Sequence, residues 1–186
     1  ISGETAKIFD LGYAENNFQM LINKFSSTYS EIDLVNAGLI VKKDSNTYDK
    51  FRDRIMFPIH DASGNTIAFG GRILKDDADK PQAKYMNSPE TILFSKKKVL
   101  YNLHLARKEK KTNNCLQIVE GYMDVIALHQ AGIKNVVATL GTAVTQENLT
   151  QCFKYTNEII CCFDGDTAGE KAAWQGVENI IPVIKD

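Results

Sequence analysis

The chain has 186 residues, of which 44% are hydrophobic and 24% charged, and its net charge is only −1, a composition typical of an ordinary globular protein. No apolar run approaches the roughly 18 residues that a membrane-spanning helix needs, and no signal peptide is recognisable, so we expect no membrane association. Because the first residue is Ile1 rather than Met and the last residues continue a helix-like pattern, we interpret the sequence as a fragment of a longer protein.

The charge is distributed unevenly along the chain. Net charge is −3 over residues 1–49, +7 over 50–111 and −5 over 112–186. A basic segment next to an acidic one suggests that a polyanion binds the first and metal ions bind the second. We place a subdomain boundary in the polar stretch 110–114, which predicts a basic N-terminal subdomain over 1–111 and a second subdomain over 112–186. For the lysines at 108–111 alone, a solvated surface is the preferred explanation.

The N-terminal region has the apolar spacing of helices up to about residue 41, with helices expected over residues 4–9, 18–25 and 32–37. Gly38 is a plausible helix C-cap. Two strands over 54–60 and 66–72 flank a turn-rich loop, which predicts a β-hairpin. Further along, we expect a mobile charged loop over 76–82 and an amphipathic helix over 99–108.

Beyond residue 114 strands and helices alternate. Apolar runs predict strands over 116–120, 136–139 and 159–163, and each is followed by a helical pattern, over 123–131, 145–153 and from 168 onward. Thr145 is the expected N-cap of the second of these helices. A βαβαβα order predicts a parallel sheet covered by helices. The fold class is therefore α/β, with a mixed α+β N-terminal part.

The four cysteines lack metal-binding spacing, and Cys161 and Cys162 fall inside a strand pattern. We expect them to be buried free thiols of a cytoplasmic protein. Trp174, Phe153 and Phe163 are expected to pack in the core.

Three carboxylates follow two of the predicted strands. Glu120 ends the first strand, and Asp164 and Asp166 come directly after the third. Because open α/β sheets bind ligands at the carboxyl ends of their strands, we expect these groups to converge. Their mutual repulsion calls for a divalent cation, and Mg²⁺ or Mn²⁺ fits oxygen ligands best. We predict Asp164 and Asp166 as metal ligands and Glu120 as a metal-linked residue or general base. Asp124 could equally cap the following helix.

Several motifs extend this pattern. Glu120-Gly121 together with Asp164-Gly-Asp166 resembles the Toprim fold of primases, topoisomerases and some nucleases. From Ile1 to Asp186 the chain also resembles the catalytic core of bacterial DnaG-type primases, in six motifs that occur in order: Arg54-Ile-Met-Phe-Pro58, Phe69-Gly-Gly-Arg72, Lys84-Tyr-Met-Asn-Ser-Pro-Glu-Thr91, Glu120-Gly-Tyr-Met-Asp-Val125, Leu140-Gly-Thr142 and Asp164-Gly-Asp-Thr-Ala-Gly169. The resemblance implies a Toprim-type parallel sheet after a basic subdomain.

The resemblance also implies an activity. A primase is a DNA-directed RNA polymerase that makes short RNA primers on a single-stranded DNA template from nucleoside triphosphates, by metal-dependent nucleotidyl transfer. Glu120, Asp164 and Asp166 would be catalytic. The family's basic groove, which holds template, primer and nucleotide, would include Arg54, Arg72, Lys84, Asn87 and Lys96, with Arg52, Lys97 and Lys98 as further candidates. Surface ion pairs with Asp53 or Asp61 are the alternative explanation for these basic side chains.

Other parts of such proteins are not expected in these residues. Members of the family carry an N-terminal zinc-binding domain and a C-terminal helicase-binding domain, so zinc, the replicative helicase and single-strand-binding protein would all be bound by regions outside the chain. A third acidic cluster is expected beyond Asp186. The fragment alone would then bind metal weakly and polymerise poorly or not at all.

Three rival interpretations remain. The run Phe163-Asp-Gly-Asp-Thr167 resembles the nucleophile motif of haloacid-dehalogenase-like phosphatases, but that motif normally opens the domain and needs a lysine and further acids downstream. A noncatalytic single-strand-binding module would use the same acids only as helix caps. A topoisomerase would carry its reactive tyrosine in a separate domain.

Overall fold

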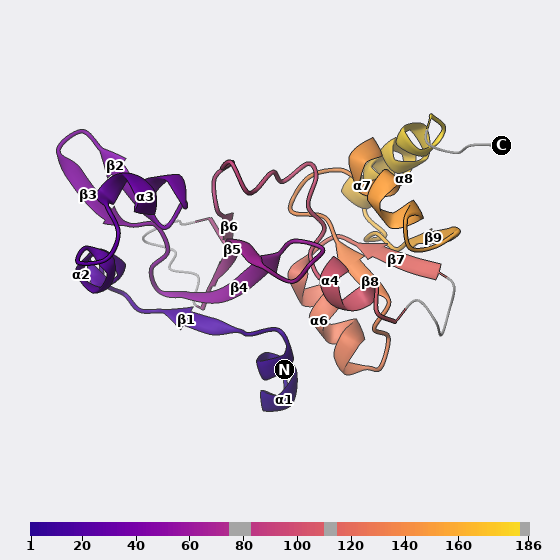
Figure 1. Ribbon diagram of the computed structural model, residues 1–186. Helices are drawn as coiled ribbons and strands as arrows, with labels where there is room; N and C mark the ends of the chain where they lie inside the picture. The colour runs from indigo at the N-terminus through magenta and orange to yellow at the C-terminus, as the bar shows by residue number, and fades with distance from the viewer. Residues whose placement is uncertain (75–82, 110–114, 183–186) are drawn as a thin grey trace. The chain divides into compact units, whose positions relative to one another are not determined.

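The computed structural model describes residues 1–74, 83–109 and 115–182 (Figure 1). These form two compact units. The N-terminal unit comprises Ala6–Ile59 and Thr66–Phe94, and the C-terminal unit comprises Ile1–Thr5, His60–Asn65 and Ser95–Asp186. The predicted loop at 76–82 and the predicted boundary at 110–114 lie outside the described residues. In the part of the chain that is described, no helix is long and apolar enough to cross a lipid bilayer.

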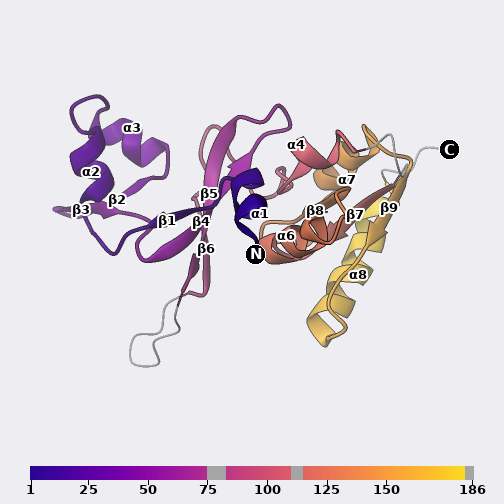
Figure 2. The same cartoon turned by 90° about the horizontal axis from the view of Figure 1, so that it is seen from below.

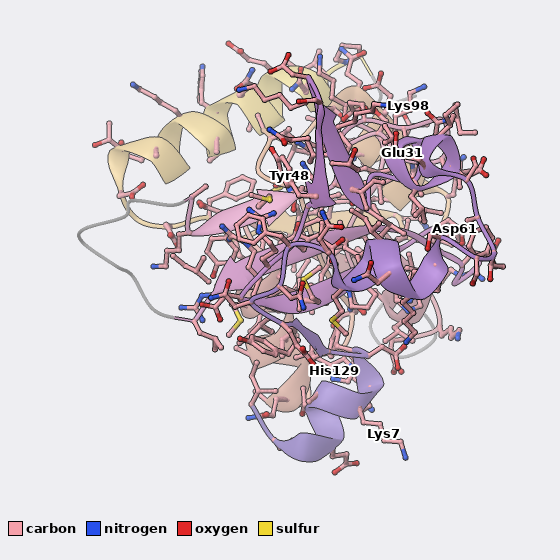
Figure 3. All side chains as sticks on the ribbon, turned by 90° about the vertical axis from the view of Figure 1, so that its left-hand side faces the viewer. Lys7, Glu31, Tyr48, Asp61, Lys98 and His129 are labelled. Atoms are coloured by element: carbon pink, nitrogen blue, oxygen red, sulfur yellow. The ribbon has the colours of Figure 1, made fainter. Side chains whose placement is uncertain are left out.

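A four-stranded sheet organises the N-terminal unit. Its strand order is β1-β4-β5-β6, and the strands are Gly12–Ala14, Arg54–His60, Thr66–Ile73 and Tyr85–Asn87. The predicted hairpin is confirmed as β4 and β5, whose Phe57, Ile59 and Ala68 are buried. Asp61, labelled in Figure 3, orders the connection because its Oδ1 accepts the backbone amides of three residues, Ser63, Gly64 and Asn65, a turn-stabilising pattern typical of Asp.

The helices at the start of the chain are short. The predicted three are confirmed as α1 (Gly3–Ile8), α2 (Met20–Phe25) and α3 (Glu31–Asn36). Gly38 has φ +70° just after α3, as expected of a C-cap region. The region to residue 41 is not all helical, however, because β1 and the start of a β2–β3 pair (Ile40–Lys43 and Asn46–Asp49) interrupt it. Strands of three or four residues are too short to show a period of two against neighbouring helical spacing.

The C-terminal unit contains the predicted parallel sheet. Strands β7 (Cys115–Val119), β8 (Val136–Ala138) and β9 (Glu158–Cys161) pair in parallel in the order β8-β7-β9. They alternate with α6 (Tyr122–Gln130), α7 (Gln146–Phe153) and α8 (Thr167–Ile180). Figure 2 shows α6 beside β8, and α7 lies against both β9 and α8. Thr145 caps α7 as predicted, since its side chain accepts the amide of Asn148 at 3.1 Å.

The predicted helix over 99–108 was too long. Helix α4 covers only Leu103–Ala106. Just before it, Tyr101 forms an isolated β-bridge with Ala138, in which the two residues exchange backbone hydrogen bonds of 2.9 and 3.2 Å. Asn102 then adopts φ +69° and donates its side-chain amide to the carbonyl of Val136 at 2.9 Å. Tertiary pairing to β8 therefore overrides the helical spacing of this segment.

Two predictions about the core were wrong. Cys161 and Cys162 are free but exposed, because β9 is an edge strand among the described strands. Only Cys152 is fully buried, and burial raises the pKa of its thiol to about 12. Trp174 is 68% exposed, since it lies roughly 200° around α8 from the buried Gly176. Phe153 and Phe163, by contrast, pack against the hydrophobic core as predicted.

Candidate functional site

The carboxyl ends of β7 and β9 bring Glu120 to the loop that contains Asp164. Glu120 follows the last residue of β7, and its Oε1 accepts the backbone amide of Asp164 at 2.9 Å. The two strands are parallel neighbours, so the residues that follow them emerge at the same edge of the sheet. The contact orients the Glu120 carboxylate and at the same time holds the backbone of the loop.

Two of the acidic side chains also cap helices. Asp166 is the N-cap of α8, where its Oδ1 accepts the amides of Ala168 and Gly169 at 2.9 and 2.8 Å. Asp124 accepts the amide of Gly121 at 3.0 Å at the start of α6. The helix-capping explanation of Asp124 is thus confirmed. For Asp166 the cap uses Oδ1, and a second oxygen of the carboxylate is left for another ligand.

A glycine that the sequence analysis did not single out holds the Asp164 loop close to α8. A Cβ atom built on Gly169 would lie 1.9 Å from the backbone oxygen of Asp164 and 2.8 Å from its carbonyl carbon. Only glycine permits this approach of helix to loop. The sequence offered one indication of this role. Gly169 falls inside the first turn of a predicted helix, where the low helical propensity of glycine makes it unfavourable unless packing requires it.

The three carboxylates suit a hard divalent cation in their chemistry. Among the described residues, no group of three His, Cys, Asp or Glu side chains is arranged to enclose a metal ion. Mg²⁺, however, is usually held by one or two carboxylates together with waters and substrate phosphates, and seldom by a cage of protein ligands alone. The residues present therefore fit a Mg²⁺ site that the substrate completes.

A pocket of about 360 Å³ adjoins Glu120 at the carboxyl ends of β7 and β8. Its polar lining includes Glu120, Thr139, Thr142, Lys171 and Gln175. The sequence analysis did not predict Lys171 and Gln175 as site residues. Both lie in α8, and the spacing of apolar residues in a helix does not show which of its turns lies next to the end of a strand. Pockets at this edge are where α/β sheets bind ligands.

Among the predicted basic-groove residues, Arg72 lies on β5, Asn87 lies on β6 and Lys84 comes directly before β6. Arg72 pairs with Tyr85 across the strands, and Asn87 pairs with Gly70. Residues at these positions share one face of the sheet, and the guanidinium of Arg72 lies 5.7 Å from the Tyr85 ring. Lys84 directly precedes β6 and is exposed.

The other two predicted residues have different surroundings. Arg54 is only 2% exposed, and it donates to the backbone carbonyls of Ala83 at 2.9 Å and Gly71 at 3.5 Å. Burial lowers the pKa of its guanidinium. Lys96 is half-buried and belongs to the C-terminal unit. The structure thus places Arg72 and Asn87 on one face of neighbouring strands and ties Arg54 to the sheet itself.

We expect Arg54→Met to destabilise the protein by about 1–3 kcal/mol, because the backbone carbonyls of Gly71 and Ala83 lose a charged donor and the first of these contacts is buried. Urea unfolding would measure this loss. Lys84→Met is the matched control, since the exposed Lys84 side chain should contribute less than about 0.5 kcal/mol. An Arg54→Met protein of unchanged stability would contradict the structural role.

The fold and the acidic site define a Toprim protein. The Toprim domain model matches residues 114–183, and the N-terminal domain model of the DNA primase catalytic core matches residues 1–107. The chain belongs to the DnaG DNA primase family.

The sequences of known DNA primases match this chain over almost its whole length. The DNA primase of Legionella pneumophila is 49% identical over 183 residues, covering 98% of this chain and 31% of that protein. The DNA primase of Pseudomonas aeruginosa is 46% identical over 189 residues, covering 100% and 28%. The chain therefore spans about a third of the length of the curated relatives it matches.

Solved structures show the same fold. A DNA primase domain from Pseudomonas aeruginosa superposes with a TM-score of 0.91 at 45% identity, covering 100% of this chain and 58% of that one. A DnaG primase catalytic domain bound to ssDNA gives 0.90 at 42% identity, covering 100% and 57%.

Proposed function

We propose that this chain is part of the catalytic core of a DNA primase, which copies single-stranded DNA into short RNA primers during replication. The observation that carries the proposal is the match of the entire chain to a DnaG catalytic domain bound to ssDNA, at 42% identity and a TM-score of 0.90. In the reaction a 3′-hydroxyl attacks the α-phosphate of a nucleoside triphosphate and pyrophosphate leaves.

In this proposal Asp164 and Asp166 hold Mg²⁺ or Mn²⁺, and Glu120 is metal-linked or acts as general base. A bound metal would activate the 3′-hydroxyl and neutralise charge on the leaving pyrophosphate. The amide of Asp164 holds the Glu120 carboxylate in a fixed orientation. The Asp166 cap fixes the loop between β9 and α8, so that the acidic side chains keep their positions when substrate arrives.

The basic residues would bind the template, the primer and the nucleotide. Arg72, Lys84 and Asn87 supply donors on or beside one pair of strands, and Lys96 adds a further cation. Arg54 would act mainly by holding the backbone at Gly71 and Ala83 in place. Phosphate contacts of this kind carry little sequence information.

The cellular setting follows from the same proposal. A primase acts in the cytoplasm at the replication fork, with the replicative helicase and single-strand-binding protein as partners. Zinc would be bound by an N-terminal domain, as in the Aquifex aeolicus primase, whose structure contains zinc-binding and RNA polymerase domains. These contacts involve regions other than the residues described above.

The proposal is tested by incubating the full-length protein with single-stranded DNA, the four nucleoside triphosphates and Mg²⁺. We expect short products that alkali hydrolyses and that disappear when template is omitted or EDTA is added. Products resistant to alkali, or none at all on a range of templates, would refute the assignment.

We expect Arg72→Ala and Lys84→Ala to weaken binding of template or nucleotide while leaving metal binding unchanged. Each lost phosphate contact should also reduce the slope of log affinity against log salt by about 0.7. Fluorescence anisotropy of labelled single-stranded DNA, at several salt concentrations, measures both effects. Unchanged affinity and unchanged slope in both variants would remove these residues from the interface.

A further inference from the structure

Two buried tyrosine rings meet beside the loop that carries Glu120. Tyr101 precedes α4, and Tyr122 is the first residue of α6. Both side chains are buried, and their ring centroids lie 4.9 Å apart at an interplanar angle of 75°. Aromatic pairs favour this edge-to-face arrangement. Since Tyr122 follows Glu120 by two residues, the contact joins the end of β7 to a segment that precedes β7 in the chain.

Tyr101 is itself held by β8. Its backbone exchanges hydrogen bonds with Ala138, and the next residue, Asn102, donates its side-chain amide to the carbonyl of Val136 at 2.9 Å. Both α4 and α6 lie against β8 (Figure 1). Because the segment at Tyr101 is bonded to the sheet, its ring gives Tyr122 a support that is fixed relative to the strands.

The start of α6 moves together with Glu120. Gly121, which separates Glu120 from Tyr122, donates its amide to the Asp124 carboxylate at 3.0 Å, and Asp124 lies in the first turn of α6. Gly121 is therefore bonded to the helix, and a shift of the helix start is passed on to Glu120. The hydrogen bond that Glu120 Oε1 accepts from the Asp164 amide at 2.9 Å would shift with it.

We propose that Tyr101 is a positioning residue for Glu120. Its ring fixes Tyr122 and with it the start of α6, and the start of α6 fixes the Glu120 carboxylate. Small displacements of a reacting group cost large factors in rate. This inference rests on the proposed catalytic role of Glu120, and it adds to that role a residue that lies outside the acidic motifs.

The test uses paired substitutions in the full-length protein. Tyr101→Leu removes the ring, and Tyr101→Phe retains it. In primer synthesis we expect kcat to fall roughly 10- to 100-fold in Tyr101→Leu, as a displaced reacting group would cause, and to stay near wild type in Tyr101→Phe. The KM for nucleoside triphosphate should stay near wild type in both variants, because Tyr101 is not among the proposed substrate-binding residues.

Leu103→Ala separates positioning from general destabilisation. Leu103 is buried two residues further along, in α4, so its truncation removes core packing from the same segment and leaves both tyrosine rings. The urea midpoint should fall in Leu103→Ala and in Tyr101→Leu, because each loses buried contacts, but kcat should fall only in Tyr101→Leu. Equal losses of kcat in the two variants overturn the inference, and so does a wild-type kcat in Tyr101→Leu.

Tyr122→Leu removes the same contact from the other side. If the two rings act through each other, the loss of kcat in the double variant Tyr101→Leu/Tyr122→Leu should be smaller than the product of the two single losses. Single losses that simply multiply would show that the rings act independently, which overturns the inference.

Hydrogen exchange provides a measurement that does not depend on catalysis. Because Glu120 accepts the Asp164 amide, that amide should exchange faster in Tyr101→Leu than in the wild type or Leu103→Ala, as mass spectrometry of peptides containing Asp164 would detect. If the wild type makes no primers, primase activity is refuted, and this measurement decides the inference. If Tyr101→Leu does not fold, Tyr122→Leu takes its place. An Asp164 amide that exchanges at the wild-type rate overturns the inference.

Discussion

Glu120→Gln is expected to abolish primer synthesis while leaving the fold of the site intact. The glutamine carbonyl can still accept the Asp164 amide that Glu120 Oε1 accepts at 2.9 Å, so the substitution removes the charge but keeps the hydrogen bond. Asp164→Ala should have the same effect on activity by removing a carboxylate that is proposed to bind the metal. Substitutions of outer-shell partners of metal ligands cost roughly 10- to 100-fold. We therefore expect losses of more than about 100-fold here.

Primer yield on a single-stranded template and DNA affinity should be measured on the same preparations. DNA affinity should stay at the wild-type value, because the proposal assigns template binding to Arg72, Lys84, Asn87 and Lys96. Glu147→Gln is the matched control, since Glu147 is an exposed carboxylate in the first turn of α7 and is not among the residues that line the pocket beside Glu120. Wild-type primer yield from Glu120→Gln or Asp164→Ala would rule out the catalytic assignment.

Gly169→Ala is expected to lower both stability and activity. The added methyl group would lie 1.9 Å from the Asp164 backbone oxygen, so either the first turn of α8 or the Asp164 loop must move. Overpacking of this kind typically costs about 1–3 kcal/mol. The movement would also break the amide contacts that Asp166 makes with Ala168 and Gly169 and would displace the Asp164 amide from Glu120.

A second glycine in the same helix provides the control. A Cβ built on Gly176 meets no atom within 4 Å, so Gly176→Ala should stabilise the protein by up to about 1 kcal/mol through helical propensity. Urea unfolding and primer synthesis would be compared for the two variants. If Gly169→Ala were as stable and as active as Gly176→Ala, the close approach of α8 to the loop would have no functional importance.

Local patterns predicted those elements whose own residues determine them. The β4–β5 hairpin has a turn-rich loop between two β-rich runs, and α7 has Thr145 at its start, so both were found with nearly correct ends. The alternation after residue 114 predicted the parallel sheet. Strand β1 and the shortened α4 were missed, because β1 exists through pairing with β4 and α4 is cut short by the Tyr101–Ala138 bridge.

The candidate site was also predictable only in part from local patterns. The acids Glu120, Asp164 and Asp166 were predicted as site residues because each lies at the end of a strand pattern or directly after one, and their catalytic role stays a prediction. Asp166 proved to be a helix cap as well. The sequence suggested that Arg54 was a contact residue, and the structure shows that its guanidinium is bonded to backbone carbonyls. Whether a basic side chain faces solvent or carbonyl oxygens depends on strands distant in sequence, which one local motif does not specify.

The sequence by itself determined the α/β class, the order of the strands and helices after residue 114, and the acidic and basic residue types that the proposed function would use. These depend on local periodicity and on short motifs, which are properties of contiguous residues. Only the tertiary structure decided that Glu120 holds the Asp164 amide, that Gly169 lies against the Asp164 carbonyl, and that Thr142 and Lys171 line one pocket. The residues of the first and third of these contacts are 20 to 50 positions apart in the sequence. Gly169 lies too close to the Asp164 backbone for any Cβ atom to fit. Such contacts arise only when the sheet and its helices pack.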